Sequence, residues 1–490
     1  MPNRRPQVTY TTAVLALWVA LALMRLLAHE MWRDELQAWM IARSSATPLE
    51  LISNLRYEGH PGLWPFCLFL ISRMTDSPVG MQMFNLAVGA TSAWILLRWA
   101  PFPRWMATSL AFGYFIAYEY GTLSRGYSLG VLFLLAFCAS WAGAGRRRRA
   151  LSALTLALLA MTSIYGVIVA AGLAAGALWE IWTHQPDATT NRRALGFAVI
   201  VALGMSTTVL FVRQPADAGF NAAPLLAPDP NAGLHALGAV WRGLAPVPPL
   251  RQDFWNRDIL EPLPYIRALA GLGFFGCVLV VLWRHRGAFL AFAVGGGGLF
   301  AFSYIVYQGG VRHHGHYFLL FVASCWMMAT SAKPELGSWG ARLLGLLAAV
   351  QLAVGIFASV MDQRLKFSGS RDTAAFIRQH YPRETGIVVE PELPGVPLAA
   401  WLARDVFFAQ SGRLGGFVIW NRQQQAPDFG RSLAAADRLA SSSGRAVLLV
   451  TTRRDVPPPR FKHVGHFEGQ IVREETYDVY LVEPASSSRH

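Results

Sequence analysis

Residues 9–28 of this 490-residue chain read TYTTAVLALWVALALMRLLA, and this stretch decides the class of fold. About 20 consecutive apolar residues are long enough to cross a bilayer as a helix. Arg4 and Arg5 precede the stretch, as in a signal peptide, but no small-residue cleavage site follows it, and the sequence MWRDE (residues 31–35) comes instead. We therefore interpret the stretch as a membrane anchor that the protein retains.

The composition extends this interpretation to most of the chain. Hydrophobic residues make up 53% of it and charged residues only 15%, whereas an ordinary soluble domain is about 25% charged. The same figures exclude a disordered chain, and the four cysteines, all in apolar segments, are interpreted as buried thiols and not as disulfides or metal ligands. The sequence thus predicts an α-helical polytopic membrane protein with about eleven transmembrane helices. Ten further spans are expected at 79–98, 104–120, 127–145, 150–165, 167–183, 194–212, 263–283, 287–307, 316–331 and 341–361.

Most of the net charge of +14 lies between these spans. Residues 1–361 hold 26 Lys and Arg against 15 Asp and Glu, while residues 362–490 hold 17 against 14. An excess of this kind orients a membrane protein with its basic loops in the cytoplasm, so nucleic acid is not an expected partner. The basic loops all fall on the cytoplasmic side only if the short apolar piece from His60 to Ile71 does not cross the membrane. The expected cytoplasmic residues are Arg4, Arg5, Arg98, Arg104, Arg146 to Arg149, Arg192, Arg193, Arg284, Arg286, Lys333 and Arg342.

This topology places the N-terminus in the cytoplasm and three stretches outside the inner (plasma) membrane. They are the loops 29–78 and 213–262 and the tail from Asp362. The chain is therefore divided into a transmembrane domain, residues 1–361, and an extracytoplasmic α/β domain, residues 362–490. Amphipathic pieces are expected at 34–43 and 48–57 in the first loop. The tail is expected to have strands at 387–389, 417–420, 447–451 and 479–482 and helices at 371–380, 396–409 and 430–442.

Polar side chains gather at the outer ends of the predicted spans, where a charged residue is by default functional. A carboxylate can take the proton of an attacking hydroxyl, and an arginine fork matches the geometry of a phosphate. The pattern therefore suits a reaction between an activated nucleophile and a phosphate-bearing substrate. A divalent cation bridging carboxylate and phosphate is compatible with it, but no ligand spacing demands one. The candidates are Asp34, Glu35, Glu58, His60, Glu119, Arg125, Tyr127, Arg312 and His313.

Each candidate also has a structural interpretation. The Asp34-Glu35 pair is equally typical of a solvated interface, and Arg125 of a headgroup anchor or a partner for Glu119. The histidines of residues 312–316 are compatible with interfacial caps or an adventitious metal site. The functional interpretation gains weight because the whole polar set falls on one side of the membrane.

These residues resemble the motifs of the GT-C glycosyltransferases, and in particular the protein O-mannosyltransferase and aminoarabinose-transferase group, also called family 39-like. The features shared are an Asp-Glu pair after the first span, a His-Pro helix at residues 60–63 (HPGL) and an outer Ser-Arg-x-Tyr at residues 124–127 (SRGY). The resemblance covers roughly residues 8–330 in the order of features, and is best in 30–130.

The resemblance implies an inverting transfer of a sugar from a polyprenyl-phosphate carrier to a hydroxyl outside the membrane. Asp34 would be the base, with Glu35 supporting it, and His60 would lie by the donor or acceptor. The lipid phosphate would be held by Arg125, Arg312 and His313. The sequence departs from the mannosyltransferase pattern at Gly62, where a second proline is usual, and it shows no inserted sugar-binding repeats in 213–262. The acceptor, whether glycan, lipid or protein, therefore stays open.

Two other classes of function are compatible with a polytopic chain. A transporter or flippase for a lipid-linked sugar is expected to have a midplane site on broken helices in paired repeats, and neither is apparent here. A non-catalytic scaffold that docks partners through residues 362–490 is the other alternative.

Overall fold

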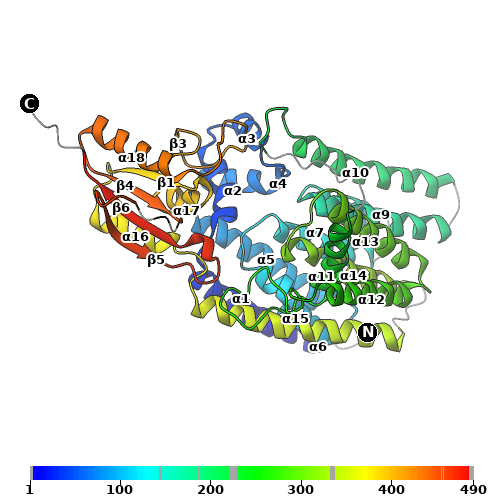
Figure 1. Ribbon diagram of the computed structural model, residues 1–490. Helices are drawn as coiled ribbons and strands as arrows, with labels where there is room; N and C mark the ends of the chain where they lie inside the picture. The colour runs from blue at the N-terminus through cyan, green and yellow to red at the C-terminus, as the bar shows by residue number, and fades with distance from the viewer. Residues whose placement is uncertain are drawn as a thin grey trace, which may run out of the picture.

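The protein has a helical membrane part and a small C-terminal sheet domain at one end of it (Figure 1). The computed structural model describes residues 4–142, 146–184, 188–219, 229–331, 337–453, 455 and 457–484. Lys333, expected in the cytoplasm, lies outside these residues. The first loop of the chain lies between the helical part and the sheet, so it is positioned to contact both (Figure 1).

Seven of the described helices are long and apolar enough to cross a membrane. Six of the expected spans coincide closely with these helices, and the seventh, at 194–212, is the apolar part of a longer one. The helices are α1 (Arg4–Ala28), α5 (Val79–Trp99), α9 (Ile164–His184), α10 (Ala188–Val212), α12 (Pro264–Leu282), α13 (Arg286–Ile305) and α15 (Ser338–Arg364).

The other four expected spans are shorter, less apolar or irregular in the structure. The stretch 104–120 is divided into α6 (Arg104–Ala111) and a π-helical turn, η1 (Tyr114–Glu119). The stretches 127–145 and 150–165 correspond to α7 (Tyr127–Trp141) and α8 (Arg146–Ala160), of 15 residues each. The last is α14 (Val311–Ala329), which begins five residues earlier than expected because its polar first turn is also helical. The total of eleven spans stays a prediction.

Small residues allow the long helices to approach closely. A Cβ on Gly172 of α9 would lie 2.4 Å from the carbonyl oxygen of Ala291 and 2.7 Å from the Cα of Gly295, both on α13. A Cβ on Gly176 would lie 2.3 Å from the carbonyl oxygen of Gly287 on the same helix. Backbone contact through small residues is the usual way in which membrane helices pack, because lipid supplies no hydrophobic drive between them.

The loop of residues 29–78 is helical, as its amphipathic pattern predicts. It contains α2 (Arg33–Ser44) and α3 (Pro48–Leu55), which coincide with the two amphipathic pieces. The short apolar piece after His60 forms α4 (Leu63–Ser72), whose 10 residues are too few to span a bilayer. The segment between α10 and α12 contains α11 (Pro230–Leu244), which packs on α12, α13 and α14.

The C-terminal domain is a six-stranded mixed sheet with helices on both faces. The strand order is β3-β2-β1-β4-β6-β5, with β1 parallel to β2 and β4 and the remaining pairs antiparallel. Alternate residues of β1 face opposite layers: Val388 packs with α18, while Ile387 and Val389 pack with α16 and α17. The elements are α16 (Ser370–His380), β1 (Gly386–Glu390), α17 (Glu392–Leu402), β2 (Val406–Phe408), β3 (Arg413–Gly415), α18 (Phe429–Ser443), β4 (Val447–Thr451), β5 (Phe461–Phe467), η2 (Arg473–Glu475) and β6 (Tyr477–Val482).

Two details of the predicted tail are wrong. The stretch 417–420 is not a strand, because the Val418 backbone bonds to the Gln37 side chain of α2 and not to another strand: N to Oε1 at 3.0 Å, and O to Nε2 at 2.8 Å. The helix expected at 396–409 ends at Leu402, and its last residues form β2 instead. The other three strands and two helices agree with the prediction within two residues.

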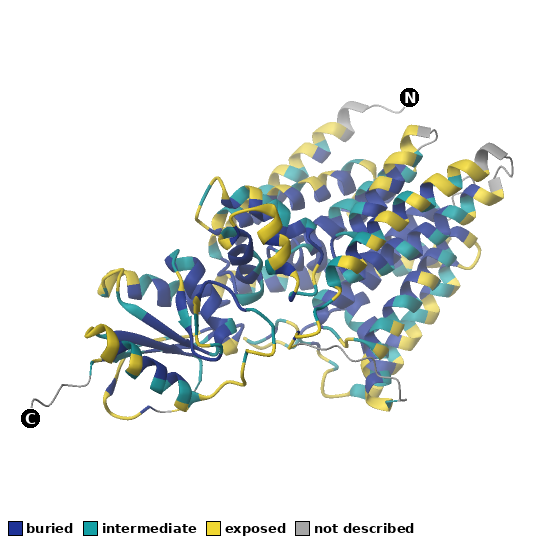
Figure 2. Cartoon of the chain, turned by 90° about the horizontal axis from the view of Figure 1, so that it is seen from above, coloured by how far each residue is buried: buried dark blue, intermediate teal, exposed yellow. Residues whose placement is uncertain are grey.

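The C-terminal domain and the loop of residues 29–78 share one hydrophobic core. It contains Leu36, Trp39 and Met40 of α2 together with residues of β1, β4, β6, α16 and α17. A second core fills the helical part, and dark, buried residues continue through both regions in Figure 2. The loop of residues 29–78 is therefore fixed between the membrane helices and the sheet, and it carries the Asp-Glu pair.

Candidate active site

The start of α2 positions the two neighbouring carboxylates of the first loop. Asp34 and Glu35 lie in the first turn of the helix, where a carboxylate interacts favourably with the helix dipole. Successive residues of a helix point about 100° apart, so their surroundings differ. The Asp34 side chain is 21% exposed, whereas the Glu35 side chain is completely buried.

Asp34 lies between two arginines from distant parts of the chain. Arg125 Nη1 donates to its Oδ2 at 2.9 Å, and Arg312 Nη2 donates to the same oxygen at 3.0 Å. Burial alone would raise the pKa of Asp34, but these two guanidinium groups lower it below its ordinary value, and Arg33 and His60 lower it further. Within the described part of the chain, no group donates to Oδ1. Asp34 is thus an ionised carboxylate with one oxygen held and the other available.

The two arginines are held by aromatic rings and keep unused donors. The Arg125 guanidinium lies over the Tyr127 ring at 5.4 Å. That of Arg312 lies over Trp32 at 5.4 Å and Trp255 at 5.9 Å, at the start of α14. Each side chain is about 15% exposed and donates one N–H to Asp34. The remaining accessible N–H groups have no acceptor among the described residues, and Arg suits bidentate binding of a phosphate.

Glu35 holds the backbone beside Arg125. Its Oε1 accepts from the Ser124 N–H at 2.6 Å, and its Oε2 accepts from the Trp32 N–H at 3.2 Å. Oε2 also accepts from His29 Nε2 at 3.1 Å, and His29 Nδ1 donates to Asp362 of α15 at 3.0 Å. Both ring nitrogens of a histidine donate only when the ring is protonated. Glu35 is therefore a positioning residue that ties the Arg125 loop to α1 and α15.

The charge of His29 makes this connection depend on pH. Burial alone would lower the pKa of His29, but Asp362 and Glu35 outweigh it and raise the pKa from 6.5 to about 10. A histidine whose pKa is raised on folding stabilises the fold fully below the unfolded pKa. That contribution is lost as the pH rises through the folded value. The stabilisation should therefore be complete below pH 6.5 and fade towards pH 10.

His29→Gln is expected to lower the free energy of unfolding by about 3–5 kcal/mol at pH 6, because it leaves two buried carboxylates without their counter-charge. Thermal unfolding of the purified protein from pH 6 to pH 10 measures this effect. The difference between variant and wild type should shrink as the pH approaches 10. The control is His380→Gln, at an exposed position of α16. Equal unfolding temperatures for the two variants at pH 6 would contradict the assignment.

Glu119, Tyr127 and His313 lie around this centre in different roles. The Glu119 carboxylate is buried and accepts from Tyr114 Oη at 2.7 Å and Trp255 Nε1 at 3.0 Å, so it supports the ring beneath Arg312. His313 Nδ1 accepts from the Gly310 N–H at 2.8 Å, which fixes the proton on Nε2. Its ring stacks on Tyr165 and meets the edge of Tyr127.

Glu58 and His60 lie on the other side of the site, towards the C-terminal domain. Gln37 Nε2 donates to Glu58 Oε1 at 2.8 Å, and burial raises the pKa of Glu58 to about 7. The exposed His60 ring donates through Nδ1 to the Glu58 carbonyl oxygen at 2.7 Å, which leaves Nε2 as an acceptor. The structure thus brings Asp34, Arg125 and Arg312 into direct contact and places the remaining candidates around them.

Sequence reasoning missed the residues that enclose this centre. Trp32 and Trp255 form a T-shaped pair 4.8 Å apart under Arg312, and tryptophans near span ends are otherwise typical of the interfacial belt. His29 and Asp362 flank predicted spans, and no local spacing indicates that they meet. In the described parts of the chain, no group of three or more His, Cys, Asp and Glu residues is arranged to hold a metal ion.

The fold can be compared with those of known proteins. No family model and no curated protein matches the sequence. The structure is similar to the crystal structure of ArnT from Cupriavidus metallidurans bound to undecaprenyl phosphate, with a TM-score of 0.50 and 12% sequence identity over 98% of this chain and 99% of that one. The apo structure of the same ArnT gives a TM-score of 0.49 with 13% identity, over 97% and 99% of the two chains. The chain therefore has the fold of this ArnT, as the resemblance of its motifs to the aminoarabinose-transferase group predicts.

Proposed function

We propose that the protein is a membrane glycosyltransferase that transfers a sugar from a polyprenyl-phosphate donor to a hydroxyl group outside the membrane. The observation that carries the proposal is the Asp34 carboxylate, which has one oxygen bound by Arg125 and Arg312 and the other oxygen available. A base and a phosphate-binding pair are thus adjacent, and the predicted topology puts them at the outer end of the membrane helices. A GT-C fold with a solved relative bound to undecaprenyl phosphate supports the choice of donor.

We propose the following reaction at this site. The acceptor oxygen attacks the anomeric carbon, and the bond from that carbon to the phosphate oxygen breaks, which inverts the anomeric centre. The proton of the acceptor hydroxyl passes to Asp34 Oδ1, and the polyprenyl phosphate leaves with the electron pair of the broken bond. Arg125, Arg312 and the Nε2–H of His313 donate hydrogen bonds to the departing phosphate, where negative charge develops.

Positioning residues support these groups. Glu35 fixes the Ser124 backbone, and the rings of Trp32 and Trp255 hold the Arg312 guanidinium. A site at the outer surface also favours a transferase over a transporter, whose substrate site is expected near the bilayer midplane.

The proposal requires one orientation in the membrane, with the N-terminus in the cytoplasm and the C-terminal domain outside. Figure 1 places α1 with its start at the end of the bundle far from the sheet. Cysteines introduced at exposed positions 147 and 430, in a background without the four native cysteines, test this orientation in intact cells. A membrane-impermeant thiol reagent should label position 430 and leave position 147 unlabelled until the membrane is broken. The reverse pattern would overturn the topology.

The function is tested with a panel of radiolabelled sugars on undecaprenyl phosphate. The purified protein is incubated with each donor and a membrane extract as a source of acceptors, and the labelled product is identified. At least one donor should yield a product in which the sugar has left the lipid. Failure of every donor, with the protein folded and binding undecaprenyl phosphate, would contradict the proposal.

A further inference from the structure

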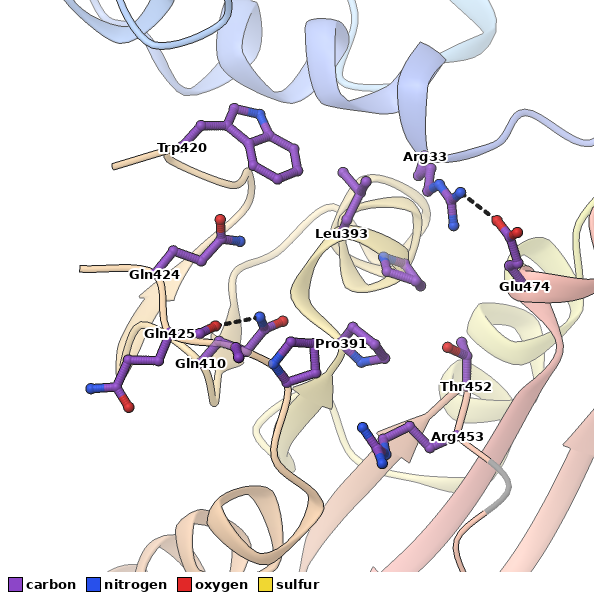
Figure 3. A pocket seen from close by; sticks show the side chains of 13 residues that line it. Arg33, Pro391, Leu393, Gln410, Trp420, Gln424, Gln425, Thr452, Arg453 and Glu474 are labelled. Carbon is purple, nitrogen blue, oxygen red and sulfur yellow. Dashed lines mark hydrogen bonds and ion pairs between the residues drawn. The ribbon is translucent and has the colours of Figure 1, made fainter. Parts of the chain in front are cut away.

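A cavity of about 630 Å³ lies between the C-terminal domain and the start of α2 (Figure 3). Trp420, Gln424 and Gln425 stand on one side of it, and Arg33, Glu474, Thr452 and Arg453 stand on the other (Figure 3). Leu393 and Pro391 lie between the two sides. Its size is in the range of cavities that bind small organic ligands, about 300–1,000 Å³.

The position of the cavity in the sheet is typical of a ligand site. It is lined by Pro391, which follows β1, and by Thr452, which follows β4. These two strands are parallel neighbours, but the connection after β1 runs to β2 on one side while the chain after β4 continues to β5 and β6 on the other. In open α/β sheets, ligands bind in the crevice at the carboxyl ends of the strands where the connections diverge in this way.

The lining indicates a neutral ligand rich in hydroxyl groups. The Trp420 ring extends towards Leu393 and offers an apolar surface (Figure 3). The Thr452 hydroxyl and the Gln424 Oε1 have no hydrogen-bond partner among the described residues, so both are available to a ligand. An aromatic ring beside amides and hydroxyls suits a sugar, which has apolar C–H faces and polar edges.

The charges of the cavity argue against an anionic ligand. Arg33 Nη2 donates to Glu474 Oε2 at 2.6 Å, and Arg453 Nε donates to Asp455 Oδ2 at 2.5 Å. Each arginine of the lining therefore already has a carboxylate partner. The Glu474 carboxylate also lines the cavity and would repel a phosphorylated or carboxylated ligand, whereas it would not repel a neutral sugar.

The cavity also adjoins the proposed base. Arg33, which lines it, precedes Asp34 in α2. The Trp420 ring lies beside the Glu58 carboxylate, and the Val418 backbone near it is fixed to Gln37, one turn along α2 from Asp34. A molecule in the cavity is thus held next to the helix that carries the base.

We propose that this cavity binds the acceptor and that the acceptor is a neutral glycan. That the ligand is the acceptor rests on the proposed function, while its chemical class rests on the lining of the cavity. Trp420 packs against a sugar ring of the glycan, Gln424 and Thr452 bind its hydroxyls, and the next sugar places its hydroxyl at Asp34. The C-terminal domain therefore selects the substrate.

Binding is measured first, by saturation-transfer NMR on the full-length protein in lipid nanodiscs. The probes are di- and trisaccharides of glucose, galactose, mannose and N-acetylglucosamine, with mannose 6-phosphate and a Ser/Thr-rich peptide as comparison ligands. At least one neutral oligosaccharide should bind. Trp420→Ala and the double variant Gln424→Ala/Thr452→Val should each weaken it about tenfold. The control is Gln423→Ala, on the same loop but outside the cavity lining.

Transfer kinetics then separate this inference from the proposed function. With a working donor, the two cavity variants should raise the KM for the glycan acceptor and leave the KM for the lipid donor unchanged. Binding of the peptide or the phosphorylated sugar in place of neutral sugars would overturn the ligand class, and an unchanged acceptor KM would overturn the acceptor role. Specific sugar binding without transfer from any donor would contradict the proposed function and support the cavity as a glycan site.

Discussion

Asp34→Asn is expected to lower the rate of sugar transfer by about 10³-fold, because a neutral amide cannot take the proton of the attacking hydroxyl. The change preserves the shape of the side chain, and the amide oxygen can still accept from Arg125 and Arg312. The fold should therefore survive, since Glu35 and not Asp34 holds the buried backbone at Ser124. Single-turnover transfer from a lipid-linked donor measures the chemical step directly.

The same variant separates catalysis from donor binding. The neutral amide leaves two guanidinium groups without a counter-charge, so the affinity for undecaprenyl phosphate should be unchanged or higher. The matched control is Asp76→Asn, which removes a carboxylate bonded to Arg43 at 3.2 Å on an exposed part of the same loop. Full activity in folded Asp34→Asn protein would exclude Asp34 as the base. A parallel loss of activity and donor affinity would make it a binding residue instead.

The pH dependence of the wild-type enzyme provides a further readout of this variant. Since Arg125 and Arg312 lower the pKa of Asp34, its carboxylate should stay ionised well below neutral pH. The acidic limb of the transfer profile should therefore lie below the ordinary range of a carboxyl group and should be absent from the residual activity of Asp34→Asn.

That Asp34, Arg125 and Arg312 lie together was predictable from charge, although their detailed contacts were not. Arg125 and Arg312 are 91 and 278 residues away from Asp34, yet the positive-inside pattern places all three on one face of the membrane. No sequence pattern indicates that both arginines donate to a single oxygen. That detail depends on the start of α14 and on the Trp255 ring, which only the tertiary packing brings close to Asp34.

The different roles of neighbouring residues were the hardest to predict from the sequence. Asp34 and Glu35 look equivalent in the sequence, but a helix turns them to different surroundings, one partly exposed and one completely buried. Glu119 lies in a π-helical turn, η1, and its buried carboxylate accepts from Trp255 Nε1. Both Glu35 and Glu119 act through other residues, and neither role has a signature in sequence spacing.

In the C-terminal domain, the local sequence pattern predicted the wrong secondary structure where tertiary contacts override it. The apolar stretch 417–420 has the composition of a strand but bonds to Gln37 of α2. Strands β2 and β3 have three residues each, too few for an alternating pattern. The five-residue strands β1 and β4 were predictable because they are buried on both faces and consist mainly of β-branched and other apolar residues.

Arg312→Gln is expected to weaken binding of undecaprenyl phosphate by about 10- to 100-fold, the range for the loss of one charge-assisted hydrogen-bond group. Arg312 should matter more than Arg125, because Trp32 and Trp255 hold its guanidinium in place before the ligand arrives. Arg312→Lys keeps the charge but loses the planar fork and the stacking, so its affinity should fall between those of the wild type and Arg312→Gln. Equilibrium binding of the labelled lipid to protein in nanodiscs measures these differences.

The contact between Arg312 and Asp34 complicates the comparison, since removing the arginine also frees the carboxylate and can repel the phosphate. The double variant Arg312→Gln/Asp34→Asn resolves this, because it removes both charges together. If Arg312 binds the phosphate itself, the double variant should bind more weakly than Asp34→Asn alone. Equal affinity of these two proteins would show that Arg312 acts only by neutralising Asp34. Arg43→Gln, which removes an arginine paired with Asp76 outside the site, should bind as the wild type does.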